Sequence, residues 1–188
     1  DLAWSVMGLS SVIRTEFVIM ASAMKLVFMS DGALYIGTNG QEFKKFHVLD
    51  GLGIALLKAV GLPLAIISGR SSEATIYRMK ELGLDENLYQ GNLAKKEPYI
   101  LIKKKFGLQD EEIAYIGDDL ADIPLLKQVG VPVSVANASE EVKEKSFYVT
   151  SKAGGEGAIR EFIELVLKAQ GKFKKALEIV TKDTYKDK

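Results

Sequence analysis

The sequence contains no cysteine and only one histidine, His47. The lack of cysteine excludes a disulfide framework, a thiolate nucleophile and a cysteine zinc site. A single histidine argues against a metal centre built from several histidines and against most histidine-based proton relays. The absence of cysteine fits a cytoplasmic protein, and a cytoplasmic location is therefore expected. We interpret His47 as a structural or interfacial residue.

Neither sign of charge is in excess, because 25 Lys and Arg residues balance 25 Asp and Glu residues. This balance gives no indication of a nucleic-acid partner. The sequence also lacks an uninterrupted apolar run of about 18 residues, so we expect no transmembrane helix and no membrane partner. With 188 residues, 47% of them hydrophobic, the chain is long enough for one globular domain with a substantial core.

The two ends of the chain differ in composition from its middle. Residues 1–23 are mostly apolar, but they lack a basic leader and are interrupted by Arg14 and Glu16, which does not fit a signal peptide. Residues 172–188 are rich in lysine and could extend as a frayed helix. We therefore expect an N-terminal extension at 1–23, one domain at 24–171 and a lysine-rich tail at 172–188.

Short apolar runs alternate with helical patterns along this domain, which predicts an α/β fold with a mostly parallel central sheet and helices on both faces. Asn39-Gly40 predicts a hairpin turn between strands at 33–37 and 41–48. Asp50 is a plausible N-cap for the first helix. The other expected strands are 25–29, 64–67, 88–89, 113–116, 131–135 and 147–150, and the expected helices are 52–60, 73–82, 97–106, 121–129, 140–145 and 157–169.

Three carboxylates follow the apolar run at 113–116 within five positions, namely Asp118, Asp119 and Asp122. Strand ends of a parallel sheet commonly carry its functional loops. Clustered carboxylates are costly unless a cation compensates them, and Mg²⁺ commonly has this role. The structural alternative is that Asp119 caps the next helix and that the other two are solvated.

Polar residues also follow the other predicted strands. Asp31 follows the run at 25–29, Ser68 and Arg70 follow the run at 64–67, and Lys95 lies beyond the run at 88–89. An acid, a hydroxyl, a lysine and a metal-type carboxylate pair on one edge suit phosphoryl transfer. Since Lys96 adjoins Lys95, the spacing does not determine which lysine faces the edge.

The order of these motifs resembles a known family. Ser68-Gly69-Arg70, Lys95 and the run from Gly117 to Asp122 are similar to motifs II, III and IV of the haloacid dehalogenase (HAD) superfamily. Further matches resemble its branch of 3-deoxy-D-manno-octulosonate 8-phosphate (KDO 8-phosphate) phosphatases; they lie at 46–54, 65–70, 88–91 and 154–161. This resemblance implies a Rossmann-like HAD fold with a β-hairpin after strand 1 and no large cap domain. It also implies Mg²⁺-dependent hydrolysis of a phosphorylated sugar acid.

The resemblance further implies roles for particular residues. Ser68 would contact the phosphoryl oxygens, Lys95 would neutralise the phosphate, and Asp118 would ligate Mg²⁺. Asp119 and Asp122 would support the metal site. Gly69, Arg70 and Arg160 would contact the substrate. The resemblance also implies a homotetramer that packs through the hairpin at 33–48.

One motif of the family is missing. The family carries Asp-x-Asp-Gly at the end of its first strand, with the nucleophile as the first Asp, but this sequence has no Asp-x-Asp before residue 100. If 25–29 is the strand, either Met29 replaces the nucleophile or about six motif residues are missing after Met29, and we favour the latter. If 17–20 is the strand, Ala21-Ser22-Ala23 replaces both acids. Asp31 is then the candidate substitute, and the alternative function is a catalytically impaired module with a binding, assembly or regulatory role.

Overall fold

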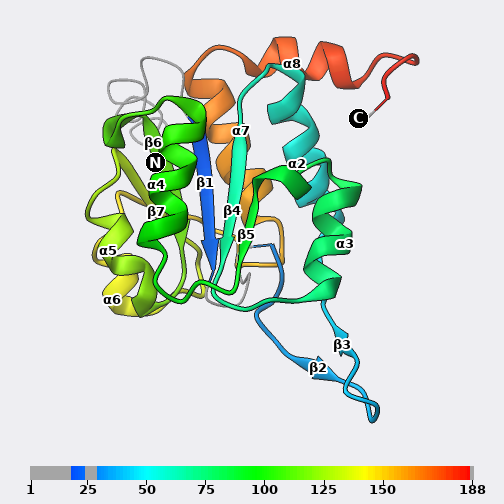
Figure 1. The fold of residues 1–188 in the computed structure, drawn as a ribbon. Coiled ribbons are helices and arrows are strands. Elements are labelled where there is room, and N and C mark those ends of the chain that lie inside the picture. Colours follow the sequence, from blue (N-terminus) through cyan, green and yellow to red (C-terminus); the bar gives the residue numbers. More distant parts are fainter. Residues whose placement is uncertain (1–17, 24–28, 187–188) are drawn as a thin grey trace.

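A parallel sheet of six strands forms the centre of the molecule (Figure 1). The computed structural model describes residues 18–23 and 29–186. The strand order is β5-β4-β1-β6-β7-β8. β4 and β6 are buried along their whole length, as expected for a parallel sheet covered on both faces. The strands are β1 (Val18–Ala23), β4 (Leu64–Ser68), β5 (Leu88–Gln90), β6 (Ile113–Gly117), β7 (Val131–Ser134) and β8 (Tyr148–Val149).

Helices cover both faces of this sheet (Figure 1). One face carries α2 (Val48–Ala59), α3 (Glu73–Glu81), α7 (Ala158–Ala169) and α8 (Phe173–Val180). The other carries α4 (Lys96–Phe106), α5 (Ile123–Leu126) and α6 (Glu140–Lys143). Short 3-10 helices η1 (Asp85–Asn87), η2 (Asp110–Glu112) and η3 (Leu120–Asp122) precede β5, β6 and α5. The predicted α/β class with a parallel sheet between helices is confirmed.

The core lies between the sheet and these helices. Tyr99, Tyr115 and Phe162 are its largest fully buried side chains. α2 and α7 pack closely because Gly53 lacks a side chain. A Cβ atom at Gly53 would lie 2.9 Å from the Cα atom of Arg160. This contact ties the first helix after the hairpin to the start of the helix that follows β8.

The predicted hairpin is present and projects from the edge at which β1 ends (Figure 1). Its two strands, β2 (Tyr35–Ile36) and β3 (Glu42–Phe43), pair antiparallel and are shorter than the predicted 33–37 and 41–48. Gly40 has a φ of 74°, which suits the turn. Beyond β3, Phe46 forms an isolated bridge with Ser30.

The position of the first strand differs from the favoured prediction. β1 covers Val18–Ala23 and pairs in parallel with both β4 and β6. Residues 18–23 therefore belong to the sheet and not to an extension, whereas 1–17 lie outside the described residues. Of the predicted strand at 25–29, the first four residues also lie outside the described part of the chain, and Met29 lies in a turn. Two apolar runs compete here, and only the pairing with β4 and β6 distinguishes them.

The predicted capping role of Asp50 is also wrong for its own helix. α2 begins at Val48, so that Asp50 lies within its first turn. The carboxylate instead accepts a hydrogen bond from the backbone amide of Arg160 at the start of α7, with N and Oδ1 2.9 Å apart. The local pattern was that of an N-cap, but the helix that is capped lies 110 residues away.

The lysine-rich tail contributes a helix to the domain. Ala176 of α8 is fully buried, and Phe173 and Val180 pack against the core. Within residues 18–23 and 29–186, no helix has the length and apolar character required to cross a membrane.

Candidate active site

The loop after β6 is organised by one buried carboxylate, that of Asp122. Its Oδ2 atom accepts hydrogen bonds from the backbone amides of Asp118 (3.0 Å) and Asp119 (3.2 Å). Gly117 permits this close turn, because a Cβ atom there would lie 2.7 Å from the Cβ atom of Asp122. The glycine that ends β6 thus has a steric reason.

Lys95 approaches the same carboxylate from the start of α4. Its Nζ atom lies 2.5 Å from Oδ1 of Asp122, which also accepts a 2.6 Å hydrogen bond from the hydroxyl of Tyr115. The side chains of Lys95 and Asp122 are almost completely buried, whereas Lys96 is exposed. The structure therefore directs Lys95, and not Lys96, into the site. Each carboxylate oxygen of Asp122 therefore has two donors from the protein, and these interactions take up its hydrogen-bonding capacity.

Asp118 is the carboxylate that remains. Its Oδ1 atom is buried and has no hydrogen-bond partner. Burial, followed by the neighbouring charges of Asp122 and Asp119, raises the pKa of Asp118 to about 8, although Lys95 acts in the opposite direction. Such a carboxylate would be stabilised in its ionised form by an added cation.

Asp119 has a capping role at the start of η3. Its Oδ1 atom accepts a hydrogen bond from the amide of Leu120 at 2.7 Å. Within the described residues, no group of three or more His, Cys, Asp or Glu side chains is placed to hold a metal ion. Protein carboxylates alone therefore do not enclose a metal here, and Asp118 is the one with an unused buried oxygen.

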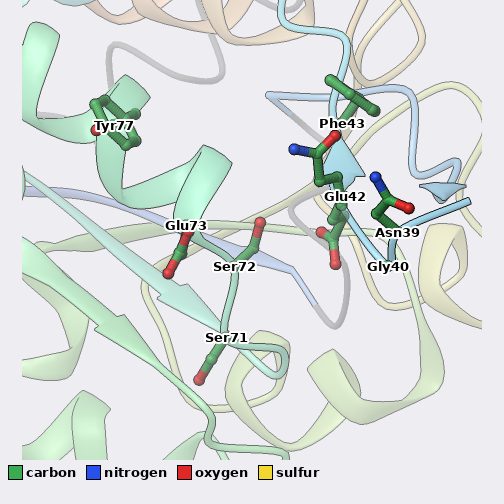
Figure 2. Close-up of a pocket in the computed structure, with 9 residues that line it drawn as sticks. Asn39, Gly40, Glu42, Phe43, Ser71, Ser72, Glu73 and Tyr77 are labelled. Atoms are coloured by element: carbon green, nitrogen blue, oxygen red, sulfur yellow. The ribbon is translucent and has the colours of Figure 1, made fainter. Parts of the chain in front are cut away.

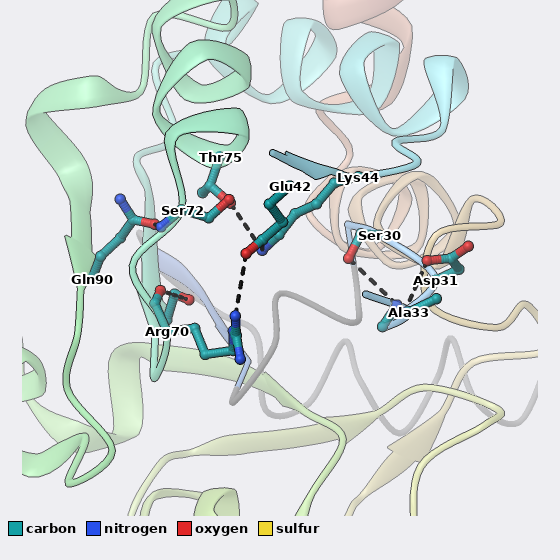
Figure 3. Close-up of polar contacts among 11 residues, drawn as sticks. Ser30, Asp31, Ala33, Glu42, Lys44, Arg70, Ser72, Thr75 and Gln90 are labelled. Carbon is teal, nitrogen blue, oxygen red and sulfur yellow. Dashed lines mark hydrogen bonds and ion pairs between the residues drawn. The ribbon is translucent and has the colours of Figure 1, made fainter. Parts of the chain in front are cut away.

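A second cluster lies at the end of β4. Ser68 is buried, and its hydroxyl donates a 2.7 Å hydrogen bond to the carbonyl oxygen of Arg70, which closes the bend through Gly69. The guanidinium of Arg70 is half exposed and donates from Nη2 to Oε2 of Glu42 in the hairpin at 3.2 Å (Figure 3). Ser68, Gly69 and Arg70 thus form one unit at the sheet edge.

The end of β1 lies between the two clusters. Ala23 is in register with Ser68 of β4, and Ala21 with Ile116 of β6. Neighbouring strands are about 4.8 Å apart, so the ends of β4 and β6 are separated by roughly 10 Å. At its carboxyl end β1 carries Ala21, Ser22 and Ala23, none of which has a carboxylate. This strand position matches the interpretation in which these residues replace the family's two acids, and not the favoured placement after Met29.

Two other predicted site residues have partners of their own. At the base of the hairpin, the carboxylate of Asp31 accepts a hydrogen bond from the amide of Ala33 (3.0 Å; Figure 3). It also accepts one from the hydroxyl of Tyr35 (2.5 Å). Arg160 donates from Nε to Glu164 at 2.5 Å along α7. The structure brings Lys95, Asp118, Asp119 and Asp122 together, with Ser68, Gly69 and Arg70 two strands away. The described contacts of Asp31 and Arg160 are not with these residues.

Sequence reasoning missed two polar partners of the site. The hydroxyl of Tyr115 holds Asp122, although the residue lies in a run that we interpreted only as a mostly apolar, buried strand. A tyrosine in a buried strand needs a partner for its hydroxyl, and that was the available signal. Glu42 holds Arg70 from the hairpin, but nothing in the sequence links two residues so far apart.

Comparisons with known proteins identify similar sequences. A family profile of haloacid dehalogenase-like hydrolases matches residues 87–163, which include Lys95, Asp118 and Asp122. The 3-deoxy-D-manno-octulosonate 8-phosphate phosphatase KdsC of Escherichia coli K12 is 41% identical over 148 residues, which cover 79% of this chain and 78% of that protein. The corresponding phosphatase of Yersinia pestis is 43% identical over 148 residues, covering 79% of both chains.

Solved structures show the same similarity. The 3-deoxy-D-manno-octulosonate 8-phosphate phosphatase of Moraxella catarrhalis, in complex with magnesium, phosphate and KDO, superposes with a TM-score of 0.84 at 38% identity, covering 91% of this chain and 97% of that one. The Yersinia pestis enzyme superposes with a TM-score of 0.82 at 38% identity, covering 88% of each chain. The chain therefore belongs to the haloacid dehalogenase superfamily and, within it, to the family of the 3-deoxy-D-manno-octulosonate 8-phosphate phosphatases.

Proposed function

We propose that the chain binds a phosphorylated sugar acid of the KDO 8-phosphate type together with Mg²⁺ and releases phosphate from it. The observation that carries this proposal is the buried cluster of Lys95, Asp122 and Asp118 at the carboxyl ends of the strands. Ligands of open α/β sheets bind at that edge. The relatives that match most of the chain are phosphatases of this substrate.

The residues present fit a magnesium ion. Mg²⁺ commonly takes one or two protein carboxylates and fills its remaining positions with water and substrate phosphate. Asp118 supplies a buried oxygen without a hydrogen-bond partner, and its raised pKa indicates that the protein without a cation disfavours the ionised form of this carboxyl group. Asp119 lies beside Asp118 in the sequence. Asp122 supports the loop by accepting hydrogen bonds from the backbone amides of both residues. When bound, the ion would stabilise negative charge on the phosphoryl group.

The other residues would recognise the two acidic ends of the ligand. Lys95 is a buried cation and would compensate the phosphate charge, and the Ser68 hydroxyl and the backbone beside it would hydrogen-bond the phosphate oxygens. Arg70 has donors beyond the one that Glu42 takes and would bind the carboxylate of the sugar acid. Gly69 keeps this loop free of a side chain. A contact of Arg160 with the ligand remains a prediction.

The proposal is tested by phosphate release from KDO 8-phosphate in the presence of Mg²⁺. We expect turnover that falls by at least about a hundredfold in Lys95→Ala, because that variant loses the cation that faces the phosphate. Turnover equal to that of Lys95→Ala would exclude the phosphatase function for this chain.

A second candidate function follows from the end of β1. The family places its nucleophilic Asp at the end of the first strand, where this chain has Ala21, Ser22 and Ala23. This observation favours a module that binds the sugar acid or its phosphate without hydrolysing it, in an assembly or regulatory role. Calorimetry with KDO 8-phosphate separates the two candidates. Binding without turnover supports the second, and no binding at millimolar ligand excludes both.

Assembly through the hairpin is part of the same proposal. Tyr35, Ile36 and Phe43 are 46%, 60% and 58% exposed, which leaves an apolar surface on a projecting element. Such a surface suits a second copy of the chain, and we propose a homotetramer. Ile36→Glu should lower the mass measured by light scattering after gel filtration, whereas Leu93→Glu, at an exposed residue of the loop between β5 and α4, serves as the control. A monomeric wild-type chain would exclude the tetramer.

The cytoplasmic location of the protein stays a prediction.

A further inference from the structure

Polar side chains connect the hairpin to the rest of the domain. β2 and β3 pair with each other in a sheet of their own. A cavity of about 600 Å³ lies between the hairpin and the start of α3; Figure 2 shows Glu42 and Phe43 on one side and Ser71, Ser72 and Glu73 on the other. Side chains that connect the hairpin to α3 and to the loop after β4 therefore help to determine where the hairpin lies.

Lys44 is one of these side chains. It is 1% exposed, and its Nζ atom lies 3.4 Å from Oε1 of Glu42 and 3.3 Å from the hydroxyl of the buried Thr75 in α3 (Figure 3). Burial lowers the pKa of Lys44, and the charge of Glu42 counteracts this effect. A buried ammonium group requires a nearby anion, so Lys44 holds the Glu42 carboxylate in place.

The same carboxylate holds Arg70 on its other oxygen. Oε2 of Glu42 lies 3.2 Å from Nη2 of Arg70, and the backbone of Arg70 is fixed by the Ser68 hydroxyl. A guanidinium has five N–H donors. Glu42 takes a donor at Nη2, and Nε is buried with no hydrogen-bond partner. The Glu42 contact therefore fixes the direction of the Arg70 side chain, and the guanidinium keeps N–H donors that Glu42 does not use.

We propose that Glu42 is a positioning residue, which holds Arg70 in the direction required to bind the carboxylate of the sugar acid. The inference rests on the proposed function, in which Arg70 makes that contact. Since Glu42 lies on β3, the hairpin that we assign to assembly also determines the direction of the Arg70 side chain. An arginine held in advance loses less rotamer freedom on binding, which favours affinity.

The test uses two probes that report on different parts of the site. Free KDO carries the carboxylate but no phosphate, and inorganic phosphate reports on Ser68 and Lys95. We expect Glu42→Gln to raise the Kd of KDO, measured by calorimetry with Mg²⁺, by roughly fivefold. The Kd of inorganic phosphate should stay within about twofold.

Matched variants separate positioning from a general loss of structure. Glu81→Gln removes an ion pair with Arg78 elsewhere on α3 and should leave the KDO affinity unchanged. Lys44→Met keeps the ion pair of Glu42 with Arg70 but loses the ammonium group beside Glu42, so it should weaken KDO binding by less than Glu42→Gln does. In an Arg70→Gln background, Glu42→Gln should have no further effect on KDO. If Glu42→Gln fails to fold, the Glu42→Gln/Lys44→Met double variant avoids the unpaired buried ammonium.

The outcomes distinguish this inference from the proposed function. Equal weakening of KDO and phosphate, or an undiminished effect of Glu42→Gln without Arg70, would overturn the positioning role and leave the proposed function standing. A wild-type chain that binds neither probe would overturn both.

Discussion

Two buried aspartates organise the backbone in different regions of the molecule. Asp122 accepts two loop amides in the candidate site and faces the cation of Lys95 and the hydroxyl of Tyr115. Asp50 accepts the amide of Arg160 in the scaffold, but its Oδ2 atom is buried with no hydrogen-bond partner. Both carboxylates thus bind backbone amides, but Asp122 has donors on both oxygens, whereas Asp50 has a donor on Oδ1 and none on Oδ2. The difference shows that the energetic effect of a buried carboxylate depends on which donors face its second oxygen.

The largest expected effect comes from removing the charge of Asp122. Asp122→Asn leaves Lys95 buried without its counter-charge, which should lower the free energy of unfolding by about 3–5 kcal/mol in urea denaturation. Adding Lys95→Met should restore much of this loss, because a neutral pair needs no compensation. A loss below about 1 kcal/mol would show that the ion pair has little influence on the fold.

The next effect concerns the pH dependence of Asp50. Burial, opposed by the amide of Arg160 and by His47, raises the pKa of Asp50 from 3.8 to about 6. The folded state then binds the proton more tightly than the unfolded chain, so this stabilisation is complete below pH 3.8 and is lost as the pH rises through about 6. The difference in unfolding free energy between wild type and Asp50→Asn should change by roughly 3 kcal/mol across this window. Parallel stability curves for the two proteins would contradict this.

A smaller effect of opposite sign is expected at Asp118. Without Mg²⁺, burial disfavours the ionised carboxylate that the unfolded chain adopts at neutral pH, and Asp118→Asn removes this cost, so it should raise the free energy of unfolding at neutral pH by about 1–2 kcal/mol. Mg²⁺ should raise the melting temperature of the wild type and not that of Asp118→Asn. Equal stabilisation of both proteins by Mg²⁺ would place the metal elsewhere. The measurement is thermal unfolding in EDTA and in Mg²⁺.

The smallest effect is expected at Asp119. Its carboxylate caps η3 through Leu120, so Asp119→Ala should cost roughly 0.5–1 kcal/mol in the same urea denaturation. Asp119→Asn, which retains a capping oxygen, is the matched control and should cost less. A cost as large as that of Asp122→Asn would erase the contrast between a buried and a peripheral carboxylate.

The sequence predicted the α/β fold. The structure brings Lys95 together with the carboxylates that follow β6, whereas their roles stay predictions. Apolar runs and helix signals identified the parallel α/β sheet and the hairpin, because their periodicity is local. The carboxylates after 113–116 and Lys95 were recognised from order and spacing. The choice between Lys95 and Lys96 required the structure, since it depends on which side chain reaches Asp122 across the sheet.

Three features depended on contacts that the sequence does not display. Two apolar runs competed for the first strand, and pairing with β4 and β6 selected Val18–Ala23. Asp50 had the local pattern of a cap, but its partner lies at the other end of the domain. Glu42 became a partner of Arg70 only because the folded chain brings β3 beside the loop after β4.

The bond between Asp50 and the Arg160 amide also has a consequence for folding. It joins residues 110 positions apart, so it forms only after the chain between them has been brought into place. Contacts of such high sequence separation slow folding and tend to form late. The hydrogen-exchange rate of the Arg160 amide therefore reports on how readily α7 separates from α2, and one backbone proton becomes a probe of the docking of these two helices.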